Sequence, residues 1–100
     1  MIDILVGVNV SDPELYSQYR AGMTPILHAH GGSFGVDVHV AEVLKSPASP
    51  AFNRLFTIRF PTLERHDAFF SNPDYLAVRK RYFEPGVSGV VKLGTYDVLA

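Results

Sequence analysis

The sequence predicts an α+β protein built from two halves, each with a strand, a helix and a second strand. Apolar residues alternate with period two in four segments and recur at helical spacing between them. A tract rich in serine and proline, residues 45–50, separates the halves and predicts a loop. Two such units in 100 residues predict one domain over residues 1–100. The expected fold is a ferredoxin-like βαββαβ sandwich, in which both helices cover one face of a four-stranded antiparallel sheet.

The first strand and the start of the first helix have clear local signals. Residues 2–10 alternate strictly and place β-branched side chains on one face, which predicts a strand with that face buried. Ser11 and Glu14 have the spacing of a capping box, and Pro13 lies in the first turn, where its missing N–H costs nothing. We therefore expect a helix that begins at Ser11.

The end of this helix and the strand after it are also predicted. Pro25 conflicts with the carbonyl of residue 21, so a kink is expected there. Gly31-Gly32 predicts a left-handed C-cap. A second strand is expected from Ser33 to about Leu44. The alternation places Phe34, Val36, Val38 and Val40 on one side and Gly35, Asp37, His39 and Ala41 on the other.

The second half repeats the order. Residues 55–60 predict a strand, and Thr62 is placed to cap a helix after it. Asn72-Pro73 caps and restarts helical chain, which ends at residues 84–86. A fourth strand is expected over residues 90–99. Its glycines, Gly89 and Gly94, together with the preceding Gly86, predict a bulge rather than a nucleotide-binding loop.

Composition excludes several classes of function. Nine Lys and Arg against ten Asp and Glu give a net charge of −1, so no basic excess supports nucleic-acid binding. The absence of cysteine excludes disulfides and thiol chemistry. No run reaches the about 20 apolar residues that a membrane span needs, and no export signal is recognisable. We expect a cytoplasmic protein with no organic cofactor, because no dinucleotide or phosphate-binding motif is present.

The sandwich leaves one sheet face without helices, and this predicts self-association. Leu5, Leu55, Ala41 and Val43 are expected on that face among polar residues. A homodimer in which the open sheet faces pack together would cover them, because a two-fold interface uses the same patch twice.

Several motifs resemble one bacterial family in their order and spacing, over roughly residues 2–99. They are, in chain order, Tyr16-Ser-Gln-Tyr19, Pro25-Ile26, His30-Gly-Gly32 with Phe34, Phe60-Pro-Thr62, Phe69-Phe70 and Ser71-Asn-Pro-Asp-Tyr75. The family is known as domain of unknown function thirteen-thirty. The chain departs from it at Arg59, where the family usually has Glu, and at His30, where it tends to have Tyr. Roles of those two residues therefore do not carry over.

The resemblance implies a dimeric α/β barrel within a superfamily that includes cofactor-free monooxygenases, lactone isomerases and haem-dependent enzymes. Fold analogy of this breadth does not identify a reaction. Two classes of function follow as expectations. One is a cofactor-free enzyme, monooxygenase- or isomerase-like, that acts on a small, partly apolar molecule. The other is a non-catalytic module that binds a small molecule or serves in assembly.

A pocket, if present, is expected between the first helix and the sheet. The helical stripe and the resemblance place Tyr19 and His30 at its border, with Phe34 from the second strand and Tyr75 from the second helical region. Each of them could instead simply pack. His30 could also cap the helix, and we favour that role over a catalytic one.

A second candidate group is Asp37, His39 and Arg59. Asp37 and His39 share one face of a strand. If Arg59 points to the same side, His39 could act as a base and Arg59 as the partner of an anion. The same residues would suit a salt bridge between subunits, which we favour. A metal would need a third ligand that no motif supplies.

Overall fold

The computed structural model describes residues 1–46 and 51–98 and has the predicted order of elements. The sheet order is β2-β3-β1-β4, and every neighbouring pair is antiparallel. The ferredoxin-like fold predicted from the sequence is thereby confirmed. Its elements are β1 (Ile2–Val10), α1 (Pro13–Ala29), β2 (Ser33–His39), β3 (Arg54–Phe60), α2 (Leu63–Ser71), α3 (Pro73–Val78), the π-helical turn η1 (Arg79–Phe83), α4 (Glu84–Gly86) and β4 (Val87–Asp97).

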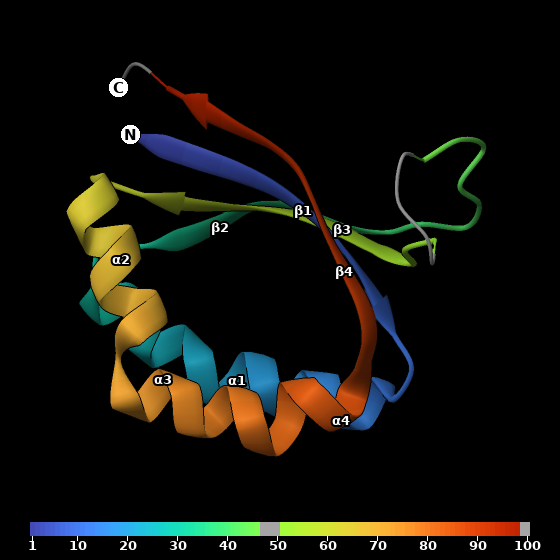
Figure 1. Ribbon diagram of the computed structural model, residues 1–100, viewed down its shortest axis with the longest axis horizontal. Coiled ribbons are helices and arrows are strands. Elements are labelled where there is room, and N and C mark those ends of the chain that lie inside the picture. Colours follow the sequence, from blue (N-terminus) through green and yellow to red (C-terminus); the bar gives the residue numbers. More distant parts are fainter. Residues whose placement is uncertain (47–50, 99–100) are drawn as a thin grey trace.

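The helices form one layer and the sheet forms the other. All helices lie on the same face of the sheet, and α3, η1 and α4 follow one another alongside α1 (Figure 1). The start of β1 and the end of β4 lie side by side because the two strands are antiparallel neighbours, with Ile2 paired to Asp97 (Figure 1). No helix in residues 1–46 and 51–98 is long and apolar enough to cross a membrane.

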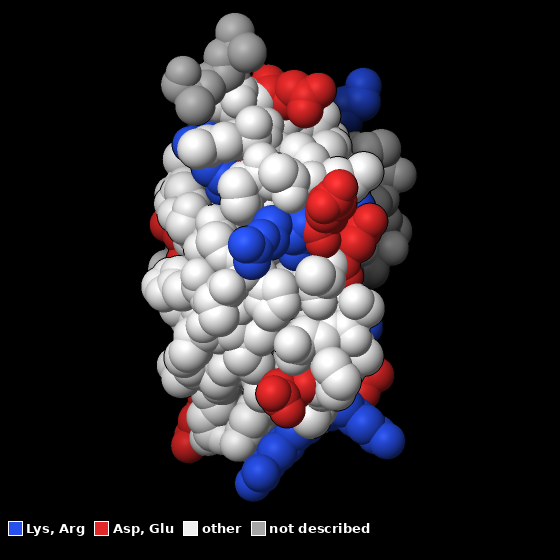
Figure 2. All heavy atoms as spheres, turned by 90° about the vertical axis from the view of Figure 1, so that its left-hand side faces the viewer, with Lys and Arg blue, Asp and Glu red and all other residues white. Residues whose placement is uncertain are grey.

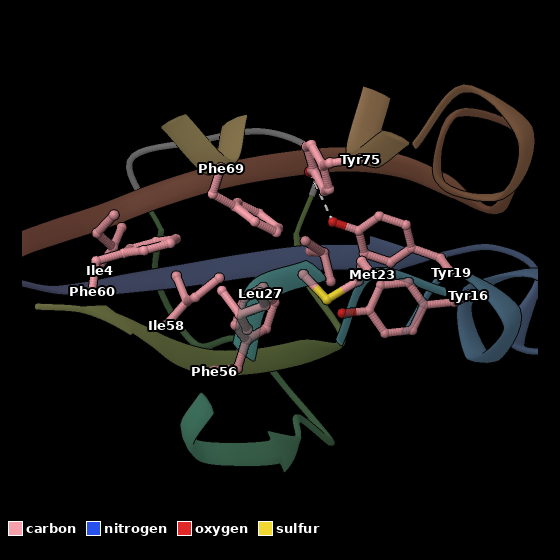
Figure 3. Packing of buried hydrophobic residues seen from close by; sticks show 11 residues of the cluster. Ile4, Tyr16, Tyr19, Met23, Leu27, Phe56, Ile58, Phe60, Phe69 and Tyr75 are labelled. Carbon is pink, nitrogen blue, oxygen red and sulfur yellow. Dashed lines mark hydrogen bonds between the residues drawn. The ribbon is translucent and has the colours of Figure 1, made fainter. Parts of the chain in front are cut away.

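The core lies between the layers, where alternate strand residues meet the apolar stripe of α1 (Figure 3). Leu27, Phe60 and Phe69 are fully buried, and each such burial stabilises the fold by about 1.5–3 kcal/mol. The other buried apolar residues are Ile4, Val8, Tyr16, Tyr19, Met23, Phe56, Ile58 and Tyr75. The prediction that one face of the first strand is buried agrees with Ile4 and Val8.

A bulge in β2 changes the faces that alternation predicts for this strand. Phe34 pairs with Ile58, but Asp37 pairs with Phe56, so three steps along β2 match two along β3. Asp37 therefore points to the helix-covered face, like Phe34, instead of the opposite one. Val38 pairs with Leu55 on the open face and is 43% exposed.

Several boundaries differ from the predicted ones. Asp12, not Ser11, caps α1, since its side chain accepts a hydrogen bond from the backbone N–H of Leu15 at 3.1 Å. The N–H of Ser11 instead donates to the carbonyl of Gly86. Strand β2 ends at His39 rather than near Leu44.

In the second half, β4 begins three residues earlier than predicted, at Val87. The predicted end of this strand, residue 99, lies outside the described residues, as do residues 47–50 of the predicted loop. Register shifts in β4 lie beside Gly89 and Gly94, which confirms the predicted bulge.

The end of α1 agrees with the predicted glycine cap. Gly31 has φ of +76°, a left-handed conformation that glycine adopts without steric cost. The helix continues through Pro25. The Thr24 hydroxyl donates to the carbonyl of Arg20, one helical turn before Thr24, at 2.5 Å. The kink at Pro25 stays a prediction.

Candidate functional site

A cavity of about 250 Å³ lies between the helices and the sheet. Its walls are mostly carbon, because the inward side chains of three strands meet the apolar stripe of α1. Phe70 of α2 and Val90 and Lys92 of β4 also line it and are exposed, so the cavity opens between α2 and β4. The buried lining residues are Ile4, Tyr19, Met23, Phe56 and Ile58.

Two buried tyrosines lie at one wall of the cavity. Tyr19 lines the cavity, and Tyr75 lies behind Tyr19. The hydroxyl oxygens of Tyr19 and Tyr75 lie 2.9 Å apart, within hydrogen-bond distance (Figure 3). Burial raises the pKa of both phenols. Both groups therefore stay protonated at neutral pH, and neither is a phenolate base.

Arg20 is the charged group of the cavity wall that is best held in place. Its Nε donates to the Tyr16 hydroxyl at 2.9 Å, and its Nη1 donates to Asp37 at 3.2 Å. Its guanidinium carbon lies 3.9 Å from the ring centroid of Phe34 and 4.6 Å from that of Phe56. Stacking and hydrogen bonds together fix its orientation.

Asp37 has a second, closer partner in Arg54. Arg54 Nε donates to Oδ1 at 2.8 Å and Nη2 donates to Oδ2 at 2.9 Å, a bidentate pair. The hydrogen bond from Arg54, with the charges of Arg54 and Arg20, lowers the pKa of Asp37. Arg20, Arg54 and Asp37 therefore form a cluster of two cations and one anion.

A second cavity, of about 440 Å³, lies on the other side of Arg20. Tyr16, His39, Asn53 and Arg54 line it, and its walls are more polar than those of the first cavity. Arg20 is the one residue that lines both of these cavities.

His66 is the histidine of the first cavity. Its Nδ1 lies 2.8 Å from Asp67 Oδ1, and its ring packs against Phe60 and Phe70 at centroid distances of 5.2 and 4.8 Å. In the tautomer that donates Nδ1–H to Asp67, Nε2 is free to accept a proton. Histidine in such a wall can transfer protons to or from a ligand.

The four predicted pocket residues do not all lie at the cavity. Tyr19 and Phe34 line the cavity, and Tyr75 contacts it through the Tyr19 hydroxyl. His30 does not line it. The His30 Nδ1 lies 2.8 Å from the carbonyl of Ile26 at the end of α1, which is the arrangement of a helix cap.

The predicted cluster of Asp37, His39 and Arg59 does not assemble. Arg59 forms a bidentate ion pair with Asp3, at 2.6 and 2.7 Å, on the open face of the sheet. Asp37 and His39 lie toward the helix-covered face, and Asp37 pairs with Arg54 and Arg20 instead. Arg54 therefore takes the place in which the sequence interpretation put Arg59.

Arg20, His66 and Lys92 line the cavity but were not predicted. Arg20 follows Tyr16 by four residues, so helical spacing could have placed the two side by side. Lys92 follows Val90 by two residues and shares its strand face. Within the part of the chain that the structure describes, no group of three His, Asp or Glu residues could hold a metal ion.

The sequence matches the family described as Domain of unknown function (DUF1330) over residues 4–84. This chain belongs to the DUF1330 family. The resemblance that the sequence motifs indicated is thereby confirmed. No curated protein matches the sequence.

Solved structures share the fold of this DUF1330 protein at low sequence identity. A protein of unknown function from Rhodopseudomonas palustris is 17% identical, with a TM-score of 0.78 over 99% of this chain and 82% of that chain. A dabb family protein with a ferredoxin-like fold from Mesorhizobium loti is 18% identical, with a TM-score of 0.67 over 99% and 97%. A dimeric ferredoxin-like protein of unknown function from Thermobifida fusca is 14% identical, with a TM-score of 0.61 over 97% and 90%.

Proposed function

We propose that this DUF1330 protein binds a small, largely apolar molecule in the cavity between α1 and the sheet. The observation that carries the proposal is the composition of the wall, which is mostly carbon with a few polar groups at fixed places. Ligand sites typically have this composition, in pockets of roughly 300–1,000 Å³. The volume of about 250 Å³ favours a ligand smaller than a typical drug.

A second candidate function is a cofactor-free enzyme, and His66 is the observation that favours it. The ring lines the cavity, and Asp67 holds Nδ1, so Nε2 can exchange a proton with a bound molecule. A monooxygenase- or isomerase-like reaction on a carbon acid would need a base of this kind. His30 and His39 are less suited, since neither lines this cavity.

We further propose that the protein acts as a homodimer through the open face of its sheet. Val38 and Tyr96 lie on this face and are 43% and 53% exposed. A two-fold contact would cover both. The dimeric state of the T. fusca protein supports the proposal. Figure 2 faces the side of the molecule on which α2 lies, and it shows charged side chains in small groups separated by broad uncharged areas.

Binding in the cavity can be tested by closing its opening. Val90 is 56% exposed and lines the cavity, so Val90→Trp would narrow the opening without disturbing the core. Leu76→Trp is the matched control, because Leu76 is 44% exposed and does not line the cavity. A panel of small aromatic compounds would be screened by thermal shift, since a ligand of the folded state raises its stability.

We expect compounds that stabilise the wild type and Leu76→Trp to lose their effect on Val90→Trp. Equal stabilisation of all three proteins would place the binding site elsewhere. No stabilisation by any compound of the panel would contradict binding in this cavity.

A further inference from the structure

Arg20 carries an unused hydrogen-bond donor. Its Nη2 is buried and has no partner, and among the described residues it is the only buried side-chain nitrogen or oxygen in this state. Buried donors are almost always paired, because leaving one unpaired forfeits its hydration without a replacement. An unpaired guanidinium nitrogen beside a cavity is therefore a donor that a bound molecule can use.

The guanidinium lies against the cavity wall. Phe34 and Phe56 both line the cavity, and the guanidinium carbon of Arg20 stacks on both rings. Two of its nitrogens are already engaged, Nε with Tyr16 and Nη1 with Asp37. Nη2 is the remaining nitrogen, and it has no hydrogen-bond partner among the described residues.

The charge of Arg20 is only partly compensated. Asp37 accepts two hydrogen bonds from Arg54, of 2.8 and 2.9 Å, but only one from Arg20, of 3.2 Å. Two guanidinium groups thus share one carboxylate, which leaves one positive charge in excess. An acceptor that is itself negative would pair with that charge as well as with the free N–H groups.

Building on the proposed binding function, we infer that the ligand is a small monoanion with an apolar body. Its carboxylate or enolate oxygen accepts from Arg20 Nη2, and its body lies against Phe34, Phe56 and Tyr19. The excess of one charge matches a monoanion. A phosphate dianion would lie near Asp37 with half of its charge unpaired, inside walls that are mostly carbon.

The test uses 2-naphthoate and 2-naphthamide, which have the same ring and nearly the same shape but differ in charge. Titration calorimetry would give the affinity of each compound for the wild type and for three variants. Arg20→Gln removes the proposed partner. Arg59→Gln removes an equal charge on the open sheet face, where Arg59 pairs with Asp3. Lys92→Gln removes the cation at the opening.

We expect the wild type to bind naphthoate at least about tenfold more tightly than naphthamide, as a charge-assisted hydrogen bond implies. Arg20→Gln should abolish this preference and change naphthamide affinity less than about threefold. Arg59→Gln should retain the preference. Loss of the preference in Lys92→Gln but not in Arg20→Gln would overturn the inference.

If Arg20→Gln does not fold, a second variant that is expected to raise naphthoate affinity keeps the test decisive. Asp37→Asn removes the carboxylate that competes for Arg20, so naphthoate affinity should rise by a factor of about two to five. A fall in affinity would contradict the inference. Equal binding of both compounds by the wild type would contradict the inference that the ligand is an anion, but it would still support binding in the cavity. Binding of neither would contradict the proposed function itself.

Discussion

The hydroxyl groups of Tyr19 and Tyr75 meet at 2.9 Å in the core, 56 residues apart in the sequence. Tyr19 comes from α1 and Tyr75 from the first turn of α3, so their hydrogen bond joins the helical segments of the two halves of the βαββαβ order. Tyr19 also lines the cavity. The same residue therefore supports the packing of the helices and forms part of the proposed binding surface.

Tyr19→Phe should lower the free energy of unfolding by about 1–3 kcal/mol, because it leaves the buried Tyr75 hydroxyl without a partner. Urea unfolding would measure the change. The double variant with Tyr75→Phe should be less destabilised than the sum of the two single variants, since no hydroxyl is then left unpaired. Tyr96→Phe is the control, as Tyr96 is 53% exposed. Unchanged stability of Tyr19→Phe would show that its hydroxyl does not hold the helices together.

Asp37 should make stability depend on pH in the acid range. Its pairing with Arg54 and Arg20 lowers its pKa in the folded protein below the ordinary value of 3.8. The stabilisation is therefore fully present above the pKa of the unfolded chain and is lost as the pH falls through the folded pKa. Asp37→Asn should be less stable than the wild type at pH 7, and the difference should shrink as the pH falls below about 4. Urea unfolding at each pH tests this, and a constant difference would exclude the ion pair as its cause.

The order of elements could be predicted from the sequence because each strand and helix carries a local signal. The strict alternation of residues 2–10 and the glycine pair after α1 needed no knowledge of the rest of the chain. Tyr19 and Phe34 line the cavity, and the sequence patterns place both on the apolar faces of their elements.

The charged part of the site could not be predicted in the same way. The bulge in β2 turns Asp37 toward the helices, and alternation alone gives no sign of it. Once turned, Asp37 meets Arg54 and Arg20, while Arg59 faces the other side with Asp3. Pairing between strands depends on register, and a shift of one residue reverses the faces of all residues beyond it.

Gly31→Ala should destabilise the protein by about 1–2 kcal/mol, because residue 31 has a left-handed conformation in which a Cβ is strained. The added Cβ would also lie 3.0 Å from Pro61 Cγ. Gly89→Ala is a suitable control, since Gly89 lies in β4 and does not have a positive φ. Thermal or urea unfolding would compare the three proteins. Equal stability of both variants would show that the cap does not require glycine.

The open sheet face should hold two copies of the chain together. Wild-type protein should sediment as a homodimer at micromolar concentration, and Val38→Lys should sediment as a monomer. Val38 is 43% exposed and lies on the open face, so a lysine there would be tolerated in the subunit but would place a charge in the apolar contact. Leu63→Lys is the matched control, because Leu63 is 59% exposed on α2, in the helical layer. A monomeric wild type would contradict the dimer, whereas dissociation by Leu63→Lys and not by Val38→Lys would move the interface to the helices.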